Sequence, residues 1–414
     1  MRNRVPRMMF PLLIVIGIMV FISGNSYAEL KNPDLPDRDG IKVADKAILH
    51  SAFRTDEILE TNIYLNNTDR KFDAITLLNP SVGIEVPFYE NKFSADYDVG
   101  IFLYGQYNTE NHIDQKVRGL AEFNFYRDYI LSLIDTFRIF TDRAADEDSR
   151  RIGRKVNDFR VGVAKEYEKL GFDIGYTNKV EVYGSSDDLI YQSITYKDRD
   201  RMSNLFDGTL SYRFLPKTYA LFENDFGLIS YYNCGEVPGS WFYEGLAGIK
   251  GEWFSRADVN FKVGFRCQQY DSSVIYADKN YIGPVFRGGF NYYPTDIDTV
   301  TVGLEKTVFE STYSNMNYYD VNLFDVKYKH SFTDKVSAGA SGSYQLSLYP
   351  TKTTQNGLDA KRQDNLFRAG AFARYDIRKW VSVEARYEYK QRTSKFDIFD
   401  YVDNLVTFRG TVGF

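Results

Sequence analysis

Residues able to perform covalent chemistry are few in this sequence. Its histidines are His50, His112 and His330, and His50 and Ser51 place a base directly beside a nucleophile. Neighbours on a strand point to opposite faces, so these two side chains cannot form a dyad. No glycine-rich phosphate loop, zinc-protease helix or nucleophile elbow is present. We therefore expect no enzyme, no metal site and no cofactor.

Selection of solutes by charged side chains is the chemistry that the sequence favours. Between 381 and 390, Glu384, Arg386, Glu388 and Lys390 alternate with apolar residues. On a β-strand this spacing makes one face apolar and the other charged. Helical spacing would mix the two classes on every face. The same alternation runs through 258–268 and 335–348, although serines dominate the polar face of the second.

The apolar faces predict which side chains point inward. An Arg or Lys that faces lipid at mid-depth costs about 2–4 kcal/mol, so the charged faces should line a common interior. The inward position of any single charged residue is explained by a solvated wall whose opposite charges neutralise each other. The whole set of charged residues favours an electric field in the interior that selects solutes. The expected pore-lining residues are Lys116, Arg118, Glu122, Lys262, Arg266, Glu305, Lys327, Arg368, Arg374, Glu384, Arg386, Glu388, Lys390 and Arg409.

The first residues have the layout of an export signal. Three arginines precede an apolar run over 8–22, and small residues lead up to Ala28. This run is short for a membrane span and typical of a cleaved secretory signal. We expect a signal peptide over 1–28, a short periplasmic segment over 29–45 and a β-barrel over 46–414. An uncleaved anchor is the alternative.

Composition excludes several classes of protein. Among 414 residues, 43% are hydrophobic, the mean hydropathy is −0.39 and only two are cysteines. These values exclude a helical membrane protein, wholesale disorder, a disulfide scaffold and a cysteine-based zinc array. A formal charge of −5 with interspersed signs argues against nucleic acid as a partner. The two cysteines, Cys234 and Cys267, could form a disulfide, but Cys267 is expected to face outward.

Turn signals give a strand count. Eight short polar breaks recur about every 40 residues, and nine longer polar segments lie between them. The residues between two successive short breaks form two long alternating segments, rather than the four short strands of a propeller blade. The pattern predicts an all-β, transmembrane, antiparallel up-and-down β-barrel of about 18 strands. Sixteen is the alternative, because 46–53 and 189–196 are ambiguous. The short turns should face the periplasm.

The last run of the chain has the features of an insertion signal. Phe408, Val412 and Phe414 share the apolar face of an alternating strand that stops on Phe414. Outer-membrane barrels carry such a terminal strand, which predicts recognition by the barrel assembly machinery and insertion into outer-membrane lipid. Deleting Phe414 should impair insertion, which heat-modifiable migration of the truncated protein would test. A large periplasmic β-sandwich would have to expose its charged faces and cover its edges.

A family resemblance rests on the first part of the barrel. The segments 54–59, 73–76, 79–85 and 93–97 form a series of an acidic first segment, a strand with a central proline and a strand with a central tyrosine. This series resembles the opening of the outer-membrane β-barrel porins associated with exopolysaccharide gene clusters. It departs from that pattern at Glu57, where Asn is expected. The resemblance implies transport but names no cargo.

Two functions follow as expectations. The first is a water-filled channel in the bacterial outer membrane for small hydrophilic solutes or polysaccharide, including a conduit for an exported exopolysaccharide. The second is a structural or loop-binding barrel without an open channel. Inward aromatic residues such as Phe102, Tyr104 and Tyr183 could stack on sugar rings. Aromatic residues near the short turns are explained by interfacial girdles alone.

Overall fold

The computed structural model describes most of the chain. Its described residues are 40–43, 46–126, 128–143, 147, 150–184, 189–191, 194–232, 237–273, 276, 280–313 and 316–414. The predicted signal peptide lies outside them, as do most residues of the segment 29–45 and Cys234 of the predicted disulfide. That disulfide and the division of the chain into three parts stay predictions.

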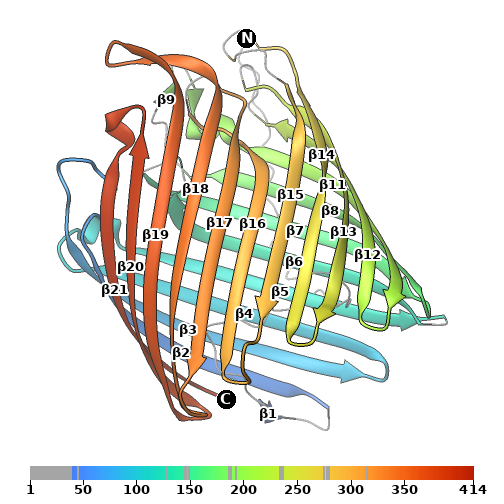
Figure 1. The fold of residues 1–414 in the computed structure, drawn as a ribbon. Coiled ribbons are helices and arrows are strands. Elements are labelled where there is room, and N and C mark those ends of the chain that lie inside the picture. Colours follow the sequence, from blue (N-terminus) through green and yellow to red (C-terminus); the bar gives the residue numbers. More distant parts are fainter. Residues whose placement is uncertain are drawn as a thin grey trace, which may run out of the picture.

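Within the described residues, eighteen strands build one closed ring, seen from the side in Figure 1. In chain order they are β2 (Ile48–Glu60), β3 (Asp73–Phe88), β4 (Asn91–Tyr104), β5 (His112–Phe125), β6 (Tyr129–Arg143), β7 (Arg151–Glu166), β8 (Leu170–Tyr183), β11 (Arg201–Leu215), β12 (Thr218–Tyr231), β13 (Ser240–Phe254), β14 (Ala257–Tyr270), β15 (Tyr281–Tyr292), β16 (Asp298–Glu310), β17 (Tyr318–Ser331), β18 (Val336–Gln355), β19 (Leu358–Arg378), β20 (Val381–Ser394) and β21 (Tyr401–Gly413).

The remaining elements are short. Strand β1 (Ile41–Lys42) pairs with the start of β2, and β9 (Leu189–Tyr191) pairs with β10 (Ile194–Thr195) away from the ring. The 3-10 helices are η1 (Asn108–Glu110), η2 (Tyr196–Arg199) and η3 (Asp397–Phe399). In the described part of the chain, no helix is long and apolar enough to cross a membrane.

Every ring strand pairs antiparallel with its neighbour in the chain. Strand β8 pairs with β11, and β2 closes the ring against β21. At the closure, the backbone N–H and C=O of Phe414 each bond to Ser51 at 2.9 Å. The predicted eighteen-stranded up-and-down barrel is therefore confirmed, and the ambiguous residues 189–196 add no strand to it.

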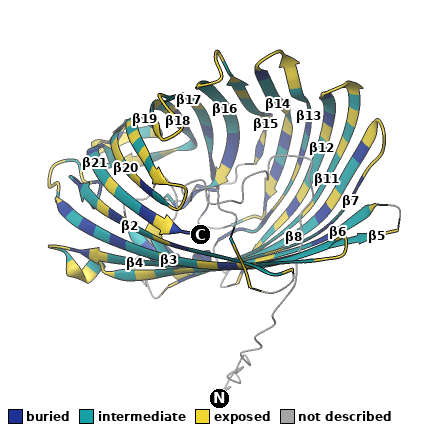
Figure 2. Ribbon diagram, turned by 90° about the horizontal axis from the view of Figure 1, so that it is seen from below, coloured by how far each residue is buried: buried dark blue, intermediate teal, exposed yellow. Residues whose placement is uncertain are grey.

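Alternation along each strand separates the two faces of the sheet, as the colours of Figure 2 show. On β14, Phe261, Val263 and Phe265 are 38%, 48% and 48% exposed, whereas Lys262 and Arg266 are 8% and 9% exposed. The exposed apolar residues face outward, and the charged residues face the interior of the ring. This arrangement, with apolar side chains outside and charged side chains inside, is expected because placing a cation against lipid costs free energy.

The two ends of the barrel differ in their connections. All eight predicted short turns are present at one end, and three turn residues adopt positive φ: Tyr89 (55°), Asp128 (61°) and Arg256 (70°). Such left-handed residues let a strand reverse within a few residues. Longer connections join the strands at the other end, which we call the loop side.

Aromatic residues gather on the outside near the short turns. Tyr126, Tyr167, Trp253 and Trp380 are 70%, 51%, 48% and 54% exposed. An amphipathic ring of this kind is favoured at a boundary between lipid and water. The arrangement agrees with the girdle interpretation of these residues and requires no ligand.

Candidate functional site

The inner wall carries cations that lie beside acidic partners one or two strands away. Lys262 Nζ is 2.6 Å from Glu223 Oε2, and Arg266 reaches Glu244 Oε2 at 3.4 Å. Glu244 also binds Arg287 Nη2 at 2.6 Å, although only 1% of this glutamate is exposed. A buried carboxylate of this kind depends on its cations, because an unpaired buried charge is costly.

A row of alternating charges crosses four adjacent strands. Arg374 on β19 lies opposite Glu384 on β20, Glu384 opposite Arg409 on β21, and Arg409 opposite Asp56 on β2. Arg409 donates two hydrogen bonds to Asp56, at 2.9 and 3.0 Å. We call Arg374, Glu384, Arg409 and Asp56 the charge ladder. It spans the closure of the ring.

The penultimate strand β20 pairs its charges along the strand. Arg386 donates to Glu384 at 3.0 Å, and Lys390 lies 3.1 Å from Glu388. The Arg386 side chain is 43% exposed and that of Lys390 is 26% exposed. Lys327 on β17 is more exposed, at 67%, and lies 3.7 Å from Asp325. These pairs are wet, so each contributes only about 0–1 kcal/mol.

The other residues predicted to line the pore also face neighbours on the inner wall. Lys116 and Arg118 lie 3.8 and 3.9 Å from aspartates of β4. Glu122 lies opposite Lys92, and Glu305 lies opposite Arg287. Arg368 donates to Gln345 at 3.5 Å, and Arg374 donates to Asp376 at 3.0 Å. Whether the set lines a conducting path stays a prediction.

Acidic partners are the part of the wall that sequence reasoning missed. Asp56, Glu223 and Glu244 were not among the expected inward residues, although each pairs with a cation that was. The alternation itself contained the signal for one of them. Phe222 and Phe226 on β12 are exposed, which places Glu223 and Asp225 on the opposite face.

A second group of polar residues lies at the loop side. Glu147, which follows β6, accepts hydrogen bonds from Ser311 Oγ at 3.0 Å, from Thr312 Oγ1 at 2.8 Å and from Tyr349 OH at 2.8 Å. The backbone N–H of Thr312 also donates to it. Arg362 Nη2 donates to the Glu147 carbonyl oxygen at 3.4 Å. Glu147 is 5% exposed, so these five contacts form a dry network.

The partners of Glu147 lie almost across the ring from it. Glu147 sits between β6 and β7, the fifth and sixth strands of the ring, whereas its partners belong to β18, β19 and the connection between β16 and β17. The strands that bound these partners, β16 and β19, are the thirteenth and sixteenth of eighteen. Glu147 therefore contacts the wall opposite β6 and β7 at the loop side.

Two further residues extend this network. Arg199 donates to the Ser311 carbonyl oxygen at 2.6 Å and to Tyr276 OH at 2.7 Å. Burial raises the pKa of Tyr276, which keeps its hydroxyl neutral and able to accept from the guanidinium. We call Glu147, Arg199, Tyr276, Ser311 and Arg362 the loop cluster. It joins connections from four parts of the chain.

Arg362 is the most enclosed cation of the loop cluster. Its side chain is 0% exposed and donates to Asp364 at 2.6 Å. Its guanidinium carbon lies 3.7 Å from the ring centroid of Phe399 and 4.6 Å from that of Tyr313. Aromatic faces and one carboxylate thus replace water around this charge.

His112 and His330 contact neighbouring side chains, and the expected insertion-signal residues lie on the outer face of the terminal strand. His112 stacks on Phe102 with ring centroids 4.5 Å apart, and His330 bonds to Asp298 at 2.8 Å. Among the described residues, no group of three His, Cys, Asp or Glu has a geometry that could hold a metal ion. On the outer face, Phe408, Val412 and Phe414 are 54%, 45% and 46% exposed.

Comparison with known proteins agrees with this architecture. A family model described as "Putative beta-barrel porin 2" matches residues 40–412. No curated protein matches the chain. Among solved structures, OccAB3 of Acinetobacter baumannii is similar with a TM-score of 0.50 and 10% identity, covering 89% of this chain and 99% of that one. OpdQ of Pseudomonas aeruginosa has a TM-score of 0.47 and 10% identity, covering 89% and 98%.

Proposed function

We propose, from the premise that the chain belongs to the family described as "Putative beta-barrel porin 2", that it forms a water-filled channel through a bacterial outer membrane for small hydrophilic solutes. One observation carries this proposal: a closed ring of eighteen strands is apolar outside and lined by ion pairs inside. A ring of this size is too wide for wall side chains alone to fill. Water would solvate the exposed charges such as Lys327 and Arg386.

The loop cluster sets the width of the proposed channel. Because Glu147 is bonded to the opposite wall, solutes would pass beside Glu147 and its partners rather than through an open mouth. Small solutes fit this arrangement better than a polysaccharide chain. Tyr104 and Tyr183 are 6% and 7% exposed, so they offer little surface for stacking on sugar rings. Phe102 is already stacked on His112.

The same cluster favours a second candidate, a binding barrel whose lumen stays closed. Glu147, Arg199 and Arg362 are all nearly inaccessible, so the loop side is packed where they lie. In this alternative the loop side binds a partner and the wall charges serve only to solvate the interior. Ion conductance separates the two candidates, because only the first requires a continuous water path.

Planar bilayers in potassium chloride test the proposal directly. We expect the purified protein to give discrete conductance steps, and Glu147→Ala to give larger steps because the connection loses its anchor on the far wall. Glu252→Ala is the matched control, since Glu252 pairs with Lys217 in an exposed position at a short turn. Folded protein without conductance steps, for the native chain and for Glu147→Ala alike, would exclude the channel.

Liposome swelling distinguishes the two cargo classes. For small solutes we expect the rate to fall steeply from monosaccharides to tetrasaccharides in the native protein and less steeply in Glu147→Ala. Equal rates along the whole series would instead favour the polysaccharide conduit.

A further inference from the structure

One junction of the ring is paired over only part of its length. Strand β15 pairs with β14 from Tyr281 to Tyr292, but it pairs with β16 only from Phe286 to Tyr292. The end of β16, residues 307–310, pairs with β17 alone. We call residues 281–285 of β15 and 307–310 of β16 the seam. It lies at the loop side of the barrel.

Two backbone carbonyls in or beside the seam are satisfied by tyrosine hydroxyls rather than by a β16 partner. Pro284 has no N–H to leave unpaired, and its carbonyl oxygen accepts from Tyr281 OH at 3.1 Å. The carbonyl oxygen of Asn280 accepts from Tyr318 OH at 3.3 Å. Unpaired backbone groups are costly beside lipid, so these two tyrosine hydroxyls lower the cost of the partial pairing.

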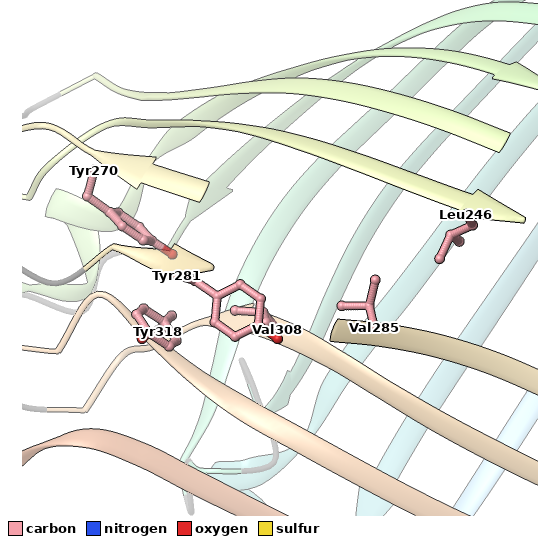
Figure 3. Close-up of a cluster of buried hydrophobic side chains, with 6 residues drawn as sticks. All are labelled: Leu246, Tyr270, Tyr281, Val285, Val308 and Tyr318. Carbon is pink, nitrogen blue, oxygen red and sulfur yellow. The ribbon is translucent and has the colours of Figure 1, made fainter. Parts of the chain in front are cut away.

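Apolar and aromatic side chains pack together along the seam (Figure 3). Tyr281 and Val285 come from β15, and Val308 comes from β16. The Tyr318 ring lies 6.1 Å from that of Tyr270 and 5.5 Å from that of Tyr281. The whole cluster, 1–8% exposed, is Leu246, Tyr270, Tyr281, Val285, Val308 and Tyr318. The charge ladder, by contrast, consists only of Arg, Glu and Asp side chains.

The outer side of the seam is apolar as well. Ile282 on β15 is 65% exposed and shares its face of the strand with the exposed Phe290 and Tyr292. Phe309 on β16 points to the interior instead, because its ring lies 5.8 Å from that of Tyr319, which stacks on Tyr349 beside Glu147. A path from the interior to the lipid through this junction would therefore meet mainly apolar groups, with Glu310 and the Lys306–Asp320 pair at 3.8 Å as the charged exceptions. Where neighbouring ring strands are paired, such a path would have to break the hydrogen bonds between them.

Glu310 bounds the seam at its loop end. This last residue of β16 accepts hydrogen bonds from Gln268 at 2.7 Å, Tyr231 at 3.1 Å and Tyr270 at 3.2 Å. These donors belong to β12 and β14, so Glu310 ties the end of β16 across β15. Paired strands bound the seam on the turn side, from Phe286 onward. The weakly joined region is thus a window with two fixed ends.

We propose that this seam is a lateral portal through which solutes with an apolar segment pass from the lumen into the outer leaflet of the membrane. Five residues of β15 make the window about 16 Å tall at roughly 3.3 Å per residue. Opening it breaks no ladder hydrogen bonds between β15 and β16 and exposes mainly apolar side chains to an apolar solute. The portal rests on the proposed water-filled lumen for access from outside.

Cross-linking the seam tests the portal. In a C234S/C267S background, Val285→Cys with Val308→Cys would be joined by a short bifunctional thiosulfonate reagent that reductant removes. The matched control joins the same strands where they are already paired, through Asn291→Cys and Thr301→Cys, whose native side chains lie 2.8 Å apart. The probe is N-phenyl-1-naphthylamine, an uncharged dye that fluoresces on reaching membrane lipid in intact cells.

We expect the joined seam to lose the barrel-dependent part of dye uptake and to recover it on reduction, whereas the control pair changes nothing. Tyr281→Phe with Tyr318→Phe should raise dye uptake, because the hydroxyls that hold the edge carbonyls are gone. Unchanged uptake after complete cross-linking, shown by gel migration of the joined protein, would overturn the portal. Conductance in potassium chloride is measured on the same variants. If the native barrel does not conduct, the channel itself is refuted. If the barrel conducts normally but cross-linking leaves dye uptake unchanged, only the portal is refuted.

Discussion

The loop cluster and the exposed pairs of strand β20 use the same residue types under opposite conditions. Arg362 is fully enclosed by Asp364 and aromatic rings, whereas Arg386 keeps 43% of its side chain exposed beside Glu384. Around Arg362 in the loop cluster, water has been replaced by fixed partners, so each partner matters for folding. Around Arg386 on β20 water remains, so the Arg386–Glu384 pair affects the electric field in the lumen more than the stability of the barrel.

Replacing the enclosed cation should have the largest effect. We expect Arg362→Met to lower the free energy of unfolding by about 3–5 kcal/mol, because Asp364 is left buried without its cation. Unfolding in urea from lipid vesicles, followed by tryptophan fluorescence, would measure this. Lys327→Met is the matched control on an exposed cation and should change the value by only ~0–1 kcal/mol. Similar losses in both variants would remove the difference between the two regions.

The charge ladder should behave more like the loop cluster than like β20. Asp56 is 1% exposed and accepts two hydrogen bonds from Arg409. Asp56→Asn should therefore cost about 1.5–3 kcal/mol, the usual contribution of hydrogen bonds to a charged group. Glu388→Gln, a change of the same kind at a wet position, is the control in the same urea titration. An effect of Asp56→Asn below that of the control would place the ladder among the wet pairs.

A single hydroxyl gives a finer comparison. Tyr349→Phe removes one donor to the buried Glu147 carboxylate and should cost about 1–3 kcal/mol, toward the lower end because three other donors remain. Tyr344→Phe removes a hydroxyl that bonds to Asn365 at 2.7 Å on the exposed outer face. We expect almost no change in unfolding for that control. If Tyr344→Phe is the more damaging change, the loop cluster is not a dry network.

The smallest effect on stability should accompany a change in ion selectivity. Arg386→Ser with Lys390→Ser removes two wet cations and should alter the free energy of unfolding by only ~0–1 kcal/mol. The wall keeps Glu384 and Glu388, so reversal potentials across a salt gradient should shift toward cation preference. A conducting double variant with an unmoved reversal potential would mean that this face of β20 lies away from the ion path.

The fold could be predicted from sequence because a period of two is a local property. Residues 258–268 show which side chains share a face, and the short turns show where the chain reverses. Register is different, because it depends on strands far apart in the sequence. Arg409 was expected to face inward, but its partner Asp56 lies 353 residues away and cannot be identified by alternation.

Only the part of the candidate site that lies on the strands could be predicted from the sequence. Inward cations follow from alternation, whereas the loop cluster depends on how connections pack inside a finished ring. Glu147 belongs to a segment without periodicity, so no local pattern distinguishes it from a solvated loop residue. The seam was hidden for a related reason: Pro284 and Tyr281 sit in an ordinary strand sequence, and only the pairing of β15 with β16 shows what their polar groups do.

The anchoring of Glu147 on the far wall has a mechanical consequence. A closed sheet one layer thick resists bending along its strands but can flatten in cross-section, as any thin-walled tube can. Glu147 lies between β6 and β7 in the chain and is bonded to the β16–β19 side, so it ties the two sides together along one diameter. The perpendicular diameter has no corresponding tie through Glu147. Squeezing by the surrounding bilayer would then change the ellipticity of the tube mainly along that second axis.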